Sequence, residues 1–331
     1  MTKDNTKNRI TSNGTNKTKK LITHDGSFHT DDIFACAALI LYLEKVNNDF
    51  SAQGGPASGW EIIRTRDEEI IKNGDYIFDV GGFYNEEKNR FDHHQVGGAG
   101  KRPVLSGVEG NSDIEYSSFG LVWKKFGAKI CGGEKAANLL DKRLVAPIDA
   151  FDNGCDLVAN KYKDVSPFFI QHVFFAMEPT WREDSDINEA FTKSVTLARE
   201  ILSREIIQVA DALLAEDSVL AVYENAADKR ILVLDRNYPF QYVLNNLPEP
   251  LFVVYPRKDG SWGAKAVRSD PKTFNNRKNF PAAWGGLRDA ELGKVAGVPD
   301  AVFCHRGLFM AVAKSKEGAI ALAHKALVES S

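Results

Sequence analysis

The chain has 331 residues, of which 43% are hydrophobic and 26% are charged. This composition is ordinary for a globular protein, and the length suits two domains. No apolar run approaches the roughly 20 residues that a membrane-spanning helix needs, which excludes a membrane protein. Four scattered cysteines form no Cys-x-x-Cys pair, so a zinc clip and a disulfide framework are not expected. Reduced thiols favour a cytoplasmic location, with an organellar address left open for a eukaryotic chain.

The formal net charge of −3 hides an uneven distribution. Residues 228–331 carry a net +6, residues 1–20 a net +5, and residues 21–227 a net −14. An acidic body suits cation binding, and a basic C-terminal part suits a polyanionic substrate. Ordinary scatter of surface charge explains the same numbers, so the split alone decides nothing.

The N-terminal part predicts a tail followed by an α/β domain. Residues 1–19 are rich in Asn, Thr and Lys and have almost nothing to bury, which predicts a disordered polar tail. A short strand at 21–23 leads into an apolar helix whose first turn holds Asp31 and Asp32, where the helix dipole favours carboxylates. Further strands are predicted at 60–66 and 76–80.

A Gly-rich loop is then predicted at 97–110, followed by helices at 114–130 and 134–151. Pro147 must kink a helix or begin a new segment there. The alternation of short strands with helices predicts an α/β fold with a doubly wound, mostly parallel sheet over residues 20–185.

The pattern changes after a helical connector at 186–227. Two apolar runs flank Lys258-Asp259-Gly260-Ser261, which predicts a hairpin. A second strand pair and a closing helix follow, so residues 228–331 are expected to form a smaller α/β domain that binds substrate. Trp181, just before the connector, is expected to pack in a core or between domains.

Histidines and aspartates gather in four patches that follow or adjoin predicted strand ends and helices. In open α/β sheets, ligands bind beyond the carboxyl ends of the strands, so these patches are expected to converge. Mixed imidazole and carboxylate ligation suits Mn²⁺, Fe²⁺, Co²⁺ or Zn²⁺ better than Mg²⁺ or Ca²⁺. The patches are His24 to Asp32, Asp79, Asp92-His93-His94, and Asp149 with Asp152.

So many ligands suggest two cations, which can clamp both oxygens of a phosphoryl centre and acidify a bound water. Asp79, at the end of a strand, is the natural carboxylate to bridge them. Each histidine ligand must be held in one tautomer by a hydrogen-bond acceptor at its other ring nitrogen, and Asp25, Asp32 or Asp92 can take this role.

The Asp92-His93-His94 triplet, together with FDVGG and the His/Asp-rich first motif, resembles the DHH phosphoesterase superfamily. Within it, the sequence is similar to the melanocyte-proliferating-gene family of metal-dependent hydrolases, described as 3′–5′ exonucleases acting on RNA. The similar segments occur in family order across about residues 21–328: THDGSFHTDD, RTRD beginning at Arg64, FDVGGFY, RFDHHQ, DAFDNG, EPTW, WGGLRDAEL, HRGLF and KEGAIALAHKAL.

The resemblance implies a fold, a cofactor and site residues. It implies a DHH-like catalytic domain with two divalent ions, most often Mn²⁺, with Mg²⁺, Co²⁺, Fe²⁺ or Zn²⁺ as alternatives. One ion would be held by His24, His29 and Asp79, and the other by Asp31, Asp79, His93 and Asp152, with Asp149 as the alternative to Asp152. His94 would face the substrate and act in catalysis together with Asp79.

The resemblance also implies substrate contacts in the C-terminal domain. Superfamily members commonly append a small module with a Gly-Gly motif, and the counterparts here are Gly285 and Gly286 with His305 and Arg306. Arg268 and Lys314 are further candidate phosphate contacts.

The leading hypothesis is a metal-dependent phosphodiesterase, a 3′–5′ exonuclease that acts on RNA more than on DNA. A second hypothesis keeps the metal chemistry but takes small phosphoesters, such as dinucleotides or pyrophosphate. A third is a non-catalytic, metal-stabilised protein that binds nucleic acid. A homodimer is left open.

Overall fold

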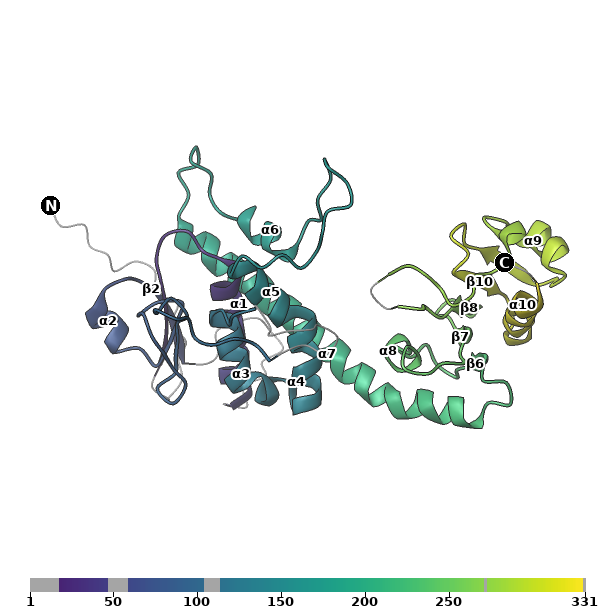
Figure 1. The fold of residues 1–331 in the computed structure, drawn as a ribbon, viewed down its shortest axis with the longest axis horizontal. Helices are drawn as coiled ribbons and strands as arrows, with labels where there is room; N and C mark the ends of the chain where they lie inside the picture. Colours follow the sequence, from purple (N-terminus) through teal and green to yellow (C-terminus); the bar gives the residue numbers. More distant parts are fainter. Residues whose placement is uncertain (1–17, 47–58, 104–113, 271–272, 330–331) are drawn as a thin grey trace. The chain divides into compact units, whose positions relative to one another are not determined.

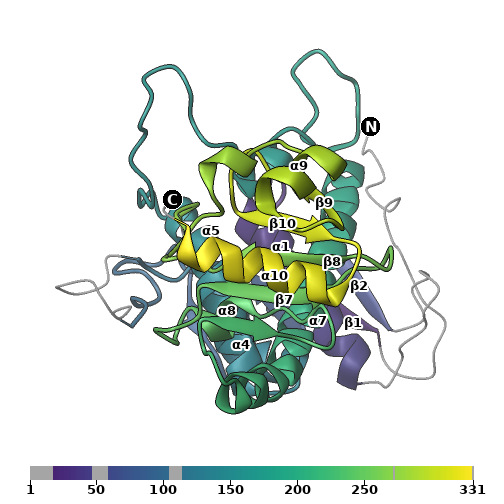
Figure 2. The ribbon, with the colours of Figure 1, turned by 90° about the vertical axis from the view of Figure 1, so that its right-hand side faces the viewer.

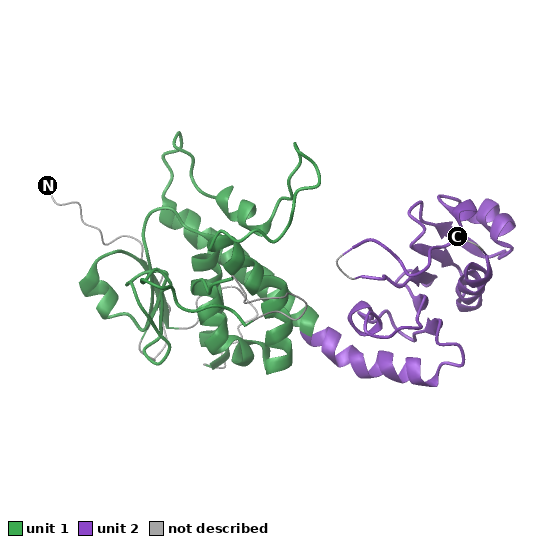
Figure 3. Ribbon diagram, in the orientation of Figure 1, with its two compact units in different colours: residues 1–209 green, residues 210–331 purple. Residues whose placement is uncertain are grey.

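The computed structural model describes residues 18–46, 59–103, 114–270 and 273–329. The predicted disordered tail therefore lies almost wholly outside the described residues, although its last residue, Lys19, already begins a strand. The chain divides into two compact units, residues 1–209 and 210–331 (Figure 3). The division falls inside one long helix, α7 (Ile187–Asn225). The domain boundaries drawn from the sequence stay a prediction.

The first unit is built on a five-stranded sheet with the order β2-β1-β3-β5-β4. Four neighbouring strands run parallel, and the fifth, β4, pairs antiparallel with β5. The sheet is thus mostly parallel and the fold is α/β, as the sequence predicts, while the doubly wound, DHH-like arrangement stays a prediction. The strands are β1 (Lys19–Thr23), β2 (Trp60–Arg64), β3 (Tyr76–Phe78), β4 (Tyr84–Asn85) and β5 (Arg90–Phe91).

Helices pack beside this sheet, and α1 and α3 lie side by side (Figure 1). The contact between them is apolar, because the α1 residues from Ile33 to Ile40 are buried, as is most of one side of α3. Burial of this kind supplies most of the stability of a short helix. The helices of this unit are α1 (Thr30–Val46), α2 (Glu68–Lys72), α3 (Ser118–Cys131), α4 (Glu134–Leu140), α5 (Ala146–Asp152), α6 (Ile170–Phe175) and the first part of α7.

A single π-helical turn, Asp141–Val145, joins α4 to α5. Pro147 is the second residue of α5, directly after this turn, and its missing N–H interrupts the run of helical backbone hydrogen bonds there. The expected effect of Pro147 is therefore confirmed as the start of a segment. Widened turns of this type often occur at functional sites, and α5 carries both Asp149 and Asp152.

The second unit has its own five-stranded sheet, in the order β6-β7-β8-β10-β9. The predicted hairpin is confirmed, since β7 and β8 pair antiparallel and Gly260 in the turn has a φ of 83°. Helix α10 crosses one face of this sheet (Figure 2) and buries Leu322 and Ala323 against it. The elements are β6 (Ile231–Val233), α8 (Gln241–Leu244), β7 (Phe252–Pro256), β8 (Trp262–Ala266), α9 (Asp289–Ala296), β9 (Ala301–Cys304), β10 (Met310–Ala313) and α10 (Lys316–Val328).

Two general expectations are also answered by the fold. Among the described residues, none of the helices combines the length and apolar character that crossing a bilayer requires. Trp181 is 93% exposed, so it does not pack in a core, whereas packing between domains stays a prediction.

Candidate metal centre

Three neighbouring strands of the first sheet bring the candidate ligands together. His24 follows β1, Asp79 follows β3, and Asp92 and His93 follow β5. These strands are parallel and adjacent, so their carboxyl ends meet at one edge of the sheet.

Two helices complete the cluster. The first turn of α1 contributes Asp31 and Asp32, and Asp152 is the last residue of α5. Both α1 aspartates are fully buried. The four sequence patches therefore converge in the fold.

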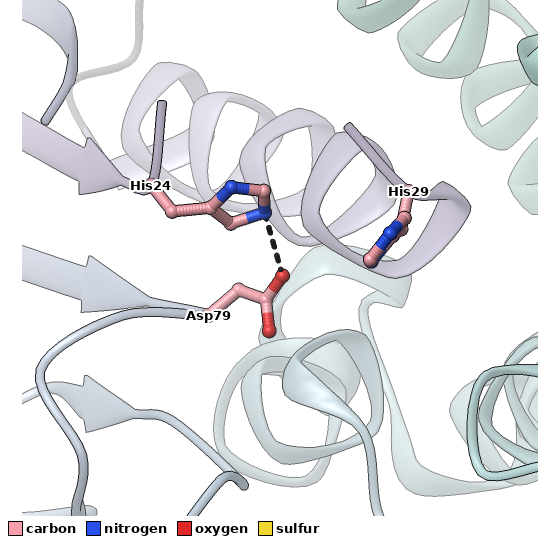
Figure 4. A group of neighbouring side chains, drawn as sticks. All are labelled: His24, His29 and Asp79. Carbon is pink, nitrogen blue, oxygen red and sulfur yellow. Dashed lines mark ion pairs between the residues drawn. The ribbon is translucent and has the colours of Figure 1, made fainter. Parts of the chain in front are cut away.

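Asp79 lies between two histidines, one at each carboxylate oxygen. Its Oδ2 is 3.1 Å from His24 Nε2, and its Oδ1 is 3.3 Å from His93 Nε2. Figure 4 shows the imidazole of His24 directed at Asp79, with His29 across from them at the start of α1. Asp79 has a φ of 53°, a left-handed conformation that is uncommon outside glycine. A carboxylate held in this way can contact two cations at once.

Three groups of side chains have ligand atoms within 4.8 Å of one another. Asp79 belongs to two of these groups and His29 to two, so the groups are linked into one continuous cluster. Every candidate metal ligand named from the sequence except Asp149 belongs to at least one group. The groups, searched over the described residues, are His24, His29 and Asp79; Asp79, His93 and His94; and His29, Asp31 and Asp152.

The carboxylates of this cluster fit a cation because the protein leaves some of their oxygens without hydrogen bonds. Asp31 Oδ1, Asp32 Oδ2 and Asp79 Oδ2 are buried and accept no hydrogen bond from any described residue. His24 Nε2 lies 3.3 Å from Asp32 Oδ2 and 3.1 Å from Asp79 Oδ2. Buried carboxylates in such proximity are unfavourable without a compensating positive charge. Oxygen and imidazole donors together suit a divalent transition-metal ion.

The acid–base properties point the same way. Burial, with the charges of Asp31 and Asp79, raises the pKa of Asp152 to about 10. Burial and the charge of Asp79 raise the pKa of Asp31 to about 6. Burial also opposes the charge on Asp79, but contacts with His24 and His93 outweigh it and lower its pKa. Without a cation, part of this cluster therefore retains protons.

Hydrogen bonds orient the histidines. His24 Nδ1 lies 2.9 Å from the carbonyl of Asp25 and donates to it, so Nε2 is the nitrogen left for a metal. His94 Nδ1 lies 2.8 Å from Asp92 Oδ1, and the His94 side chain is 58% exposed. The side chain of Asp25 instead faces Arg66, at 3.3 Å. Of the three acceptors considered from the sequence, Asp92 orients a histidine ring, whereas Asp25 does so only through its backbone.

The third acceptor, Asp32, has a different role. Its Oδ1 accepts a hydrogen bond from the backbone N–H of His29, at 3.1 Å, while its Oδ2 lies 3.3 Å from His24 Nε2. Asp32 therefore fixes the segment that carries both histidines, and its second oxygen stays near the cluster.

Asp149 and Asp152 occupy different surroundings although they lie one helical turn apart. Asp152 Oδ2 is 3.3 Å from His93 Nε2. Asp149 is fully buried and binds Arg102, with both Nε and Nη2 at 2.6 Å from Oδ2. Its Oδ1 accepts from Ser117 Oγ at 2.6 Å and from the backbone N–H of Gly120 at 3.0 Å. The protein itself thus supplies partners to both oxygens of Asp149.

Two residues near the cluster were not identified from the sequence. Ser118 donates through Oγ to Asp79 at 3.2 Å and through its backbone N–H to Asp31 at 3.2 Å. The Ser117-Ser118 pair before an apolar helix is a helix-start signal that pointed to this position. Arg64, noted only as part of a motif, donates to the carbonyl of Gly26 at 2.6 Å in the segment between His24 and His29.

The second unit gathers four of its predicted substrate residues at one end of its sheet. Gly286 donates its N–H to the carbonyl of Cys304 at 3.0 Å, which places the Gly285-Gly286 turn beside His305 and Arg306. A Cβ on Gly285 would lie 3.1 Å from a methyl carbon of Leu308, a tight contact that would require the leucine side chain to shift.

Arg268 and Lys314 lie at opposite ends of their neighbouring strands. Arg268 follows the end of β8 that pairs with Met310, the first residue of β10, and its guanidinium lies over the ring of Phe274. Lys314 follows the last residue of β10, at the far end of the same strand pair. The fold thus brings Arg268 to the end of the sheet that carries His305, and leaves Lys314 at the other.

Comparison with known proteins identifies relatives along nearly the whole chain. Residues 20–327 match the sequence model of the MYG1_exonuc family, described as "Uncharacterised protein family (UPF0160)". The MYG1 protein C27H6.8 of Caenorhabditis elegans is 30% identical over 336 residues, covering 92% of this chain and 94% of that protein. The MYG1 exonucleases of Mus musculus and Homo sapiens are each 28% identical, covering 93% of this chain and 84% and 86% of those proteins.

Proposed function

This chain belongs to the MYG1 exonuclease family, and from that premise we propose that it is a metal-dependent phosphodiesterase that removes nucleotides from the 3′ end of RNA. Two relatives carry the name exonuclease, which supports nucleic acid as the substrate. The sequence resemblance to 3′–5′ exonucleases of RNA supports the direction and the preference over DNA.

The observation that carries the proposal is the position of Asp79 between His24 and His93, with each carboxylate oxygen facing one imidazole. In this proposal His24, His29 and Asp79 hold one divalent ion, and Asp31, Asp79, His93 and Asp152 hold the other. Asp152 is preferred to Asp149 because Arg102, Ser117 and Gly120 already occupy the oxygens of Asp149. Mn²⁺ is the ion we expect, given the mixture of imidazole and carboxylate donors.

The chemistry divides between the ions and the chain. When bound, the two ions would acidify a water and neutralise charge on the scissile phosphate. The chain supplies an acid for the leaving oxygen. Because Asp92 holds Nδ1 of His94, the exposed ring has Nε2 available for the substrate. The hydrogen bond that His94 donates to Asp92 raises the pKa of His94, which favours the protonated form that an acid needs.

The second unit would hold the rest of the RNA. Residues 228–331 carry a net +6, and Arg268, His305 and Arg306 lie at one end of the sheet beside the Gly285-Gly286 turn. Basic side chains are common contacts of a phosphate backbone. We assign these residues, and not Lys314, to a common phosphate-binding surface.

The test begins with metal analysis of the purified protein, followed by incubation with Mn²⁺ and 5′-labelled RNA or DNA. We expect stepwise shortening of RNA that EDTA abolishes. Asp79→Asn should lower the rate more than about 100-fold, because it weakens ligation of both ions at once. Asp25→Asn is the matched control, since it changes a neighbouring aspartate whose side chain faces Arg66.

Other outcomes would contradict the proposal in distinguishable ways. Turnover of dinucleotides or pyrophosphate alone would indicate a hydrolase of small phosphoesters. RNA binding without cleavage under any metal would indicate a nucleic-acid-binding protein.

A further inference from the structure

A small pocket opens directly beside the candidate metal centre in the first unit. Its volume is about 170 Å³, and it lies between the start of α1, the end of α5 and helix α6. Three of its lining residues, His29, Asp31 and Asp152, form one of the ligand groups described above. The pocket wall is therefore continuous with the place where a scissile phosphate would be bound.

Two partly exposed aromatic residues also line the pocket. Phe151 is 38% exposed and Phe175 is 43% exposed, and their ring centroids lie 6.1 Å apart. The ring of His172 stands nearly perpendicular to both, at 6.1 and 6.4 Å. Phenyl rings left open to solvent next to a polar pocket offer flat apolar faces to a ligand.

A buried side-chain amide that lines the pocket has an oxygen without a hydrogen-bond donor among the described residues. Gln171 is 4% exposed and lines the pocket, and its Oε1 accepts no hydrogen bond from any residue the structure describes. Leaving a buried acceptor unpaired is unfavourable, so this oxygen calls for a donor from outside the protein. Such a donor has to belong to a ligand or to water in the pocket.

We propose that this pocket receives the base of the substrate's terminal nucleotide, which stacks on Phe151 or Phe175 while one of its N–H groups donates to Gln171. The proposal rests on the proposed nuclease function. Every nucleobase has an aromatic face, and all four RNA bases carry N–H donors, so both features of the wall are used. A pocket of this size takes one ring system, because sites for larger ligands begin at about 300 Å³.

The order of residues on α5 supports this assignment. Phe151 immediately precedes Asp152, so a base stacked on the phenyl ring is placed beside a candidate metal ligand by the same turn of helix. Stacking would thereby orient the last nucleotide relative to the reacting phosphate. A purely apolar ligand fits the pocket less well, because the polar residues His29, Asp31 and Asp152 also line it.

The first experiment measures binding without turnover. RNA with 2-aminopurine as its 3′-terminal base and a non-hydrolysable terminal linkage is titrated with the protein in the presence of Mn²⁺. We expect quenching of the fluorophore as it stacks. The variant that lacks the stacking ring, Phe151→Ala or Phe175→Ala, should bind about 10-fold more weakly and show less quenching. Gln171→Leu should weaken binding without removing the quenching, whereas Gln171→Glu, which keeps an acceptor, should weaken it less.

Trp181→Ala is the matched control, because Trp181 is an exposed aromatic residue that does not line the pocket. Thermal unfolding of each variant verifies that the fold is retained. Unquenched fluorescence in the wild-type complex, or equal binding by the wild type and both phenylalanine variants, would overturn the proposal. Because this measurement needs no cleavage, it remains informative if the nuclease activity is absent.

A second experiment compares RNA substrates that differ only in the last base. Wild-type protein should show a KM about 10-fold higher for RNA that ends in an abasic nucleotide. In Phe151→Ala the difference between the two substrates should shrink, since the stacking partner is gone. Equal KM values for both substrates in the wild type would contradict base recognition while leaving the exonuclease assignment intact.

Discussion

Arg64 and Gly26 form a hydrogen bond that holds the metal-binding segment in place. The Nη2 of Arg64 donates to the Gly26 carbonyl at 2.6 Å, and its Nη1 donates to Asn188 at 3.1 Å. The guanidinium also lies over the ring of Phe191, 4.5 Å from its centroid. One side chain therefore ties the segment between His24 and His29 to the start of α7.

Arg64→Met should weaken Mn²⁺ binding about 10-fold, because residues that orient metal ligands typically contribute this much to affinity. Arg64→Lys should recover only part of the loss, since an ammonium group lacks the planar fork that reaches two acceptors. Calorimetric titration with Mn²⁺ measures both. Arg66→Met is the control, because Arg66 forms an ion pair with the exposed carboxylate of Asp25 and not with the backbone of the segment. Equal affinities for the Arg64→Met and Arg66→Met variants would show that Arg64 is not needed to position the segment.

Asp149 and Asp152 should respond in opposite ways to mutation. Asp149→Ala leaves the buried Arg102 with Asp141, at 2.7 Å, as its remaining ionic partner among the residues that the structure describes. We expect the free energy of unfolding to fall by about 3 kcal/mol, the lower end of the range for breaking a buried pair. Asp152→Asn replaces a carboxyl group that burial keeps protonated with a neutral amide, so the metal-free protein should be no less stable while its affinity for Mn²⁺ falls.

Urea unfolding in EDTA, with and without later addition of Mn²⁺, separates these effects. Retention of metal binding by Asp152→Asn, together with its loss in a folded Asp149→Asn protein, would reverse the assignment of the ligand.

The convergence of His24, Asp79 and His93 was predictable because each follows a strand, and parallel strands end at a common edge. The sequence could not decide between Asp149 and Asp152 as the metal ligand, because residues three apart on a helix share one face. What separates them is Arg102, which reaches Asp149 from a distant segment whose backbone N–H binds the Ile114 carbonyl. No local pattern encodes such a pairing.

The aromatic wall escaped the sequence analysis for a related reason. Phe151 and Phe175 lie on two short helices, and apolar residues in such helices are normally assigned to a core. Their exposure becomes visible only when the two helices are seen to meet beside Asp31. Trp181 is the reverse case, because packing in a core was one of the two expectations for it and its side chain is 93% exposed.

The second unit predicts a contrast between Arg268 and Lys314. Arg268→Ala should raise the KM for long RNA and reduce the slope of log affinity against log salt by about 1, as expected when one phosphate contact is lost. Lys314→Ala should leave both unchanged, because Lys314 lies at the opposite end of the β8–β10 pair. Binding titrations at several salt concentrations measure both slopes. A larger effect from Lys314 would place the RNA at the other end of the sheet.

Metal binding should release protons, and its affinity should rise with pH. In the metal-free protein, burial would lower the pKa of His24, but contacts with Asp32 and Asp79 outweigh it and raise the pKa to about 10. The pKa of Asp152 is also raised to about 10, chiefly by burial. Both groups therefore hold protons near pH 7, and both must lose them to ligate a cation.

The sign follows directly. Each proton displaced by the metal makes the apparent affinity increase with pH, for as long as the pH stays below the raised pKa values. Titrations with Mn²⁺ at about pH 6, 7 and 8, in buffers with different ionisation enthalpies, count the protons released. We expect between one and two protons at about pH 7, and about one fewer for Asp152→Asn. An affinity for Mn²⁺ that does not change with pH, with a binding enthalpy that does not depend on the buffer, would mean that the ligands are already deprotonated. That result would contradict the prediction that burial keeps protons on these ligands until a cation displaces them.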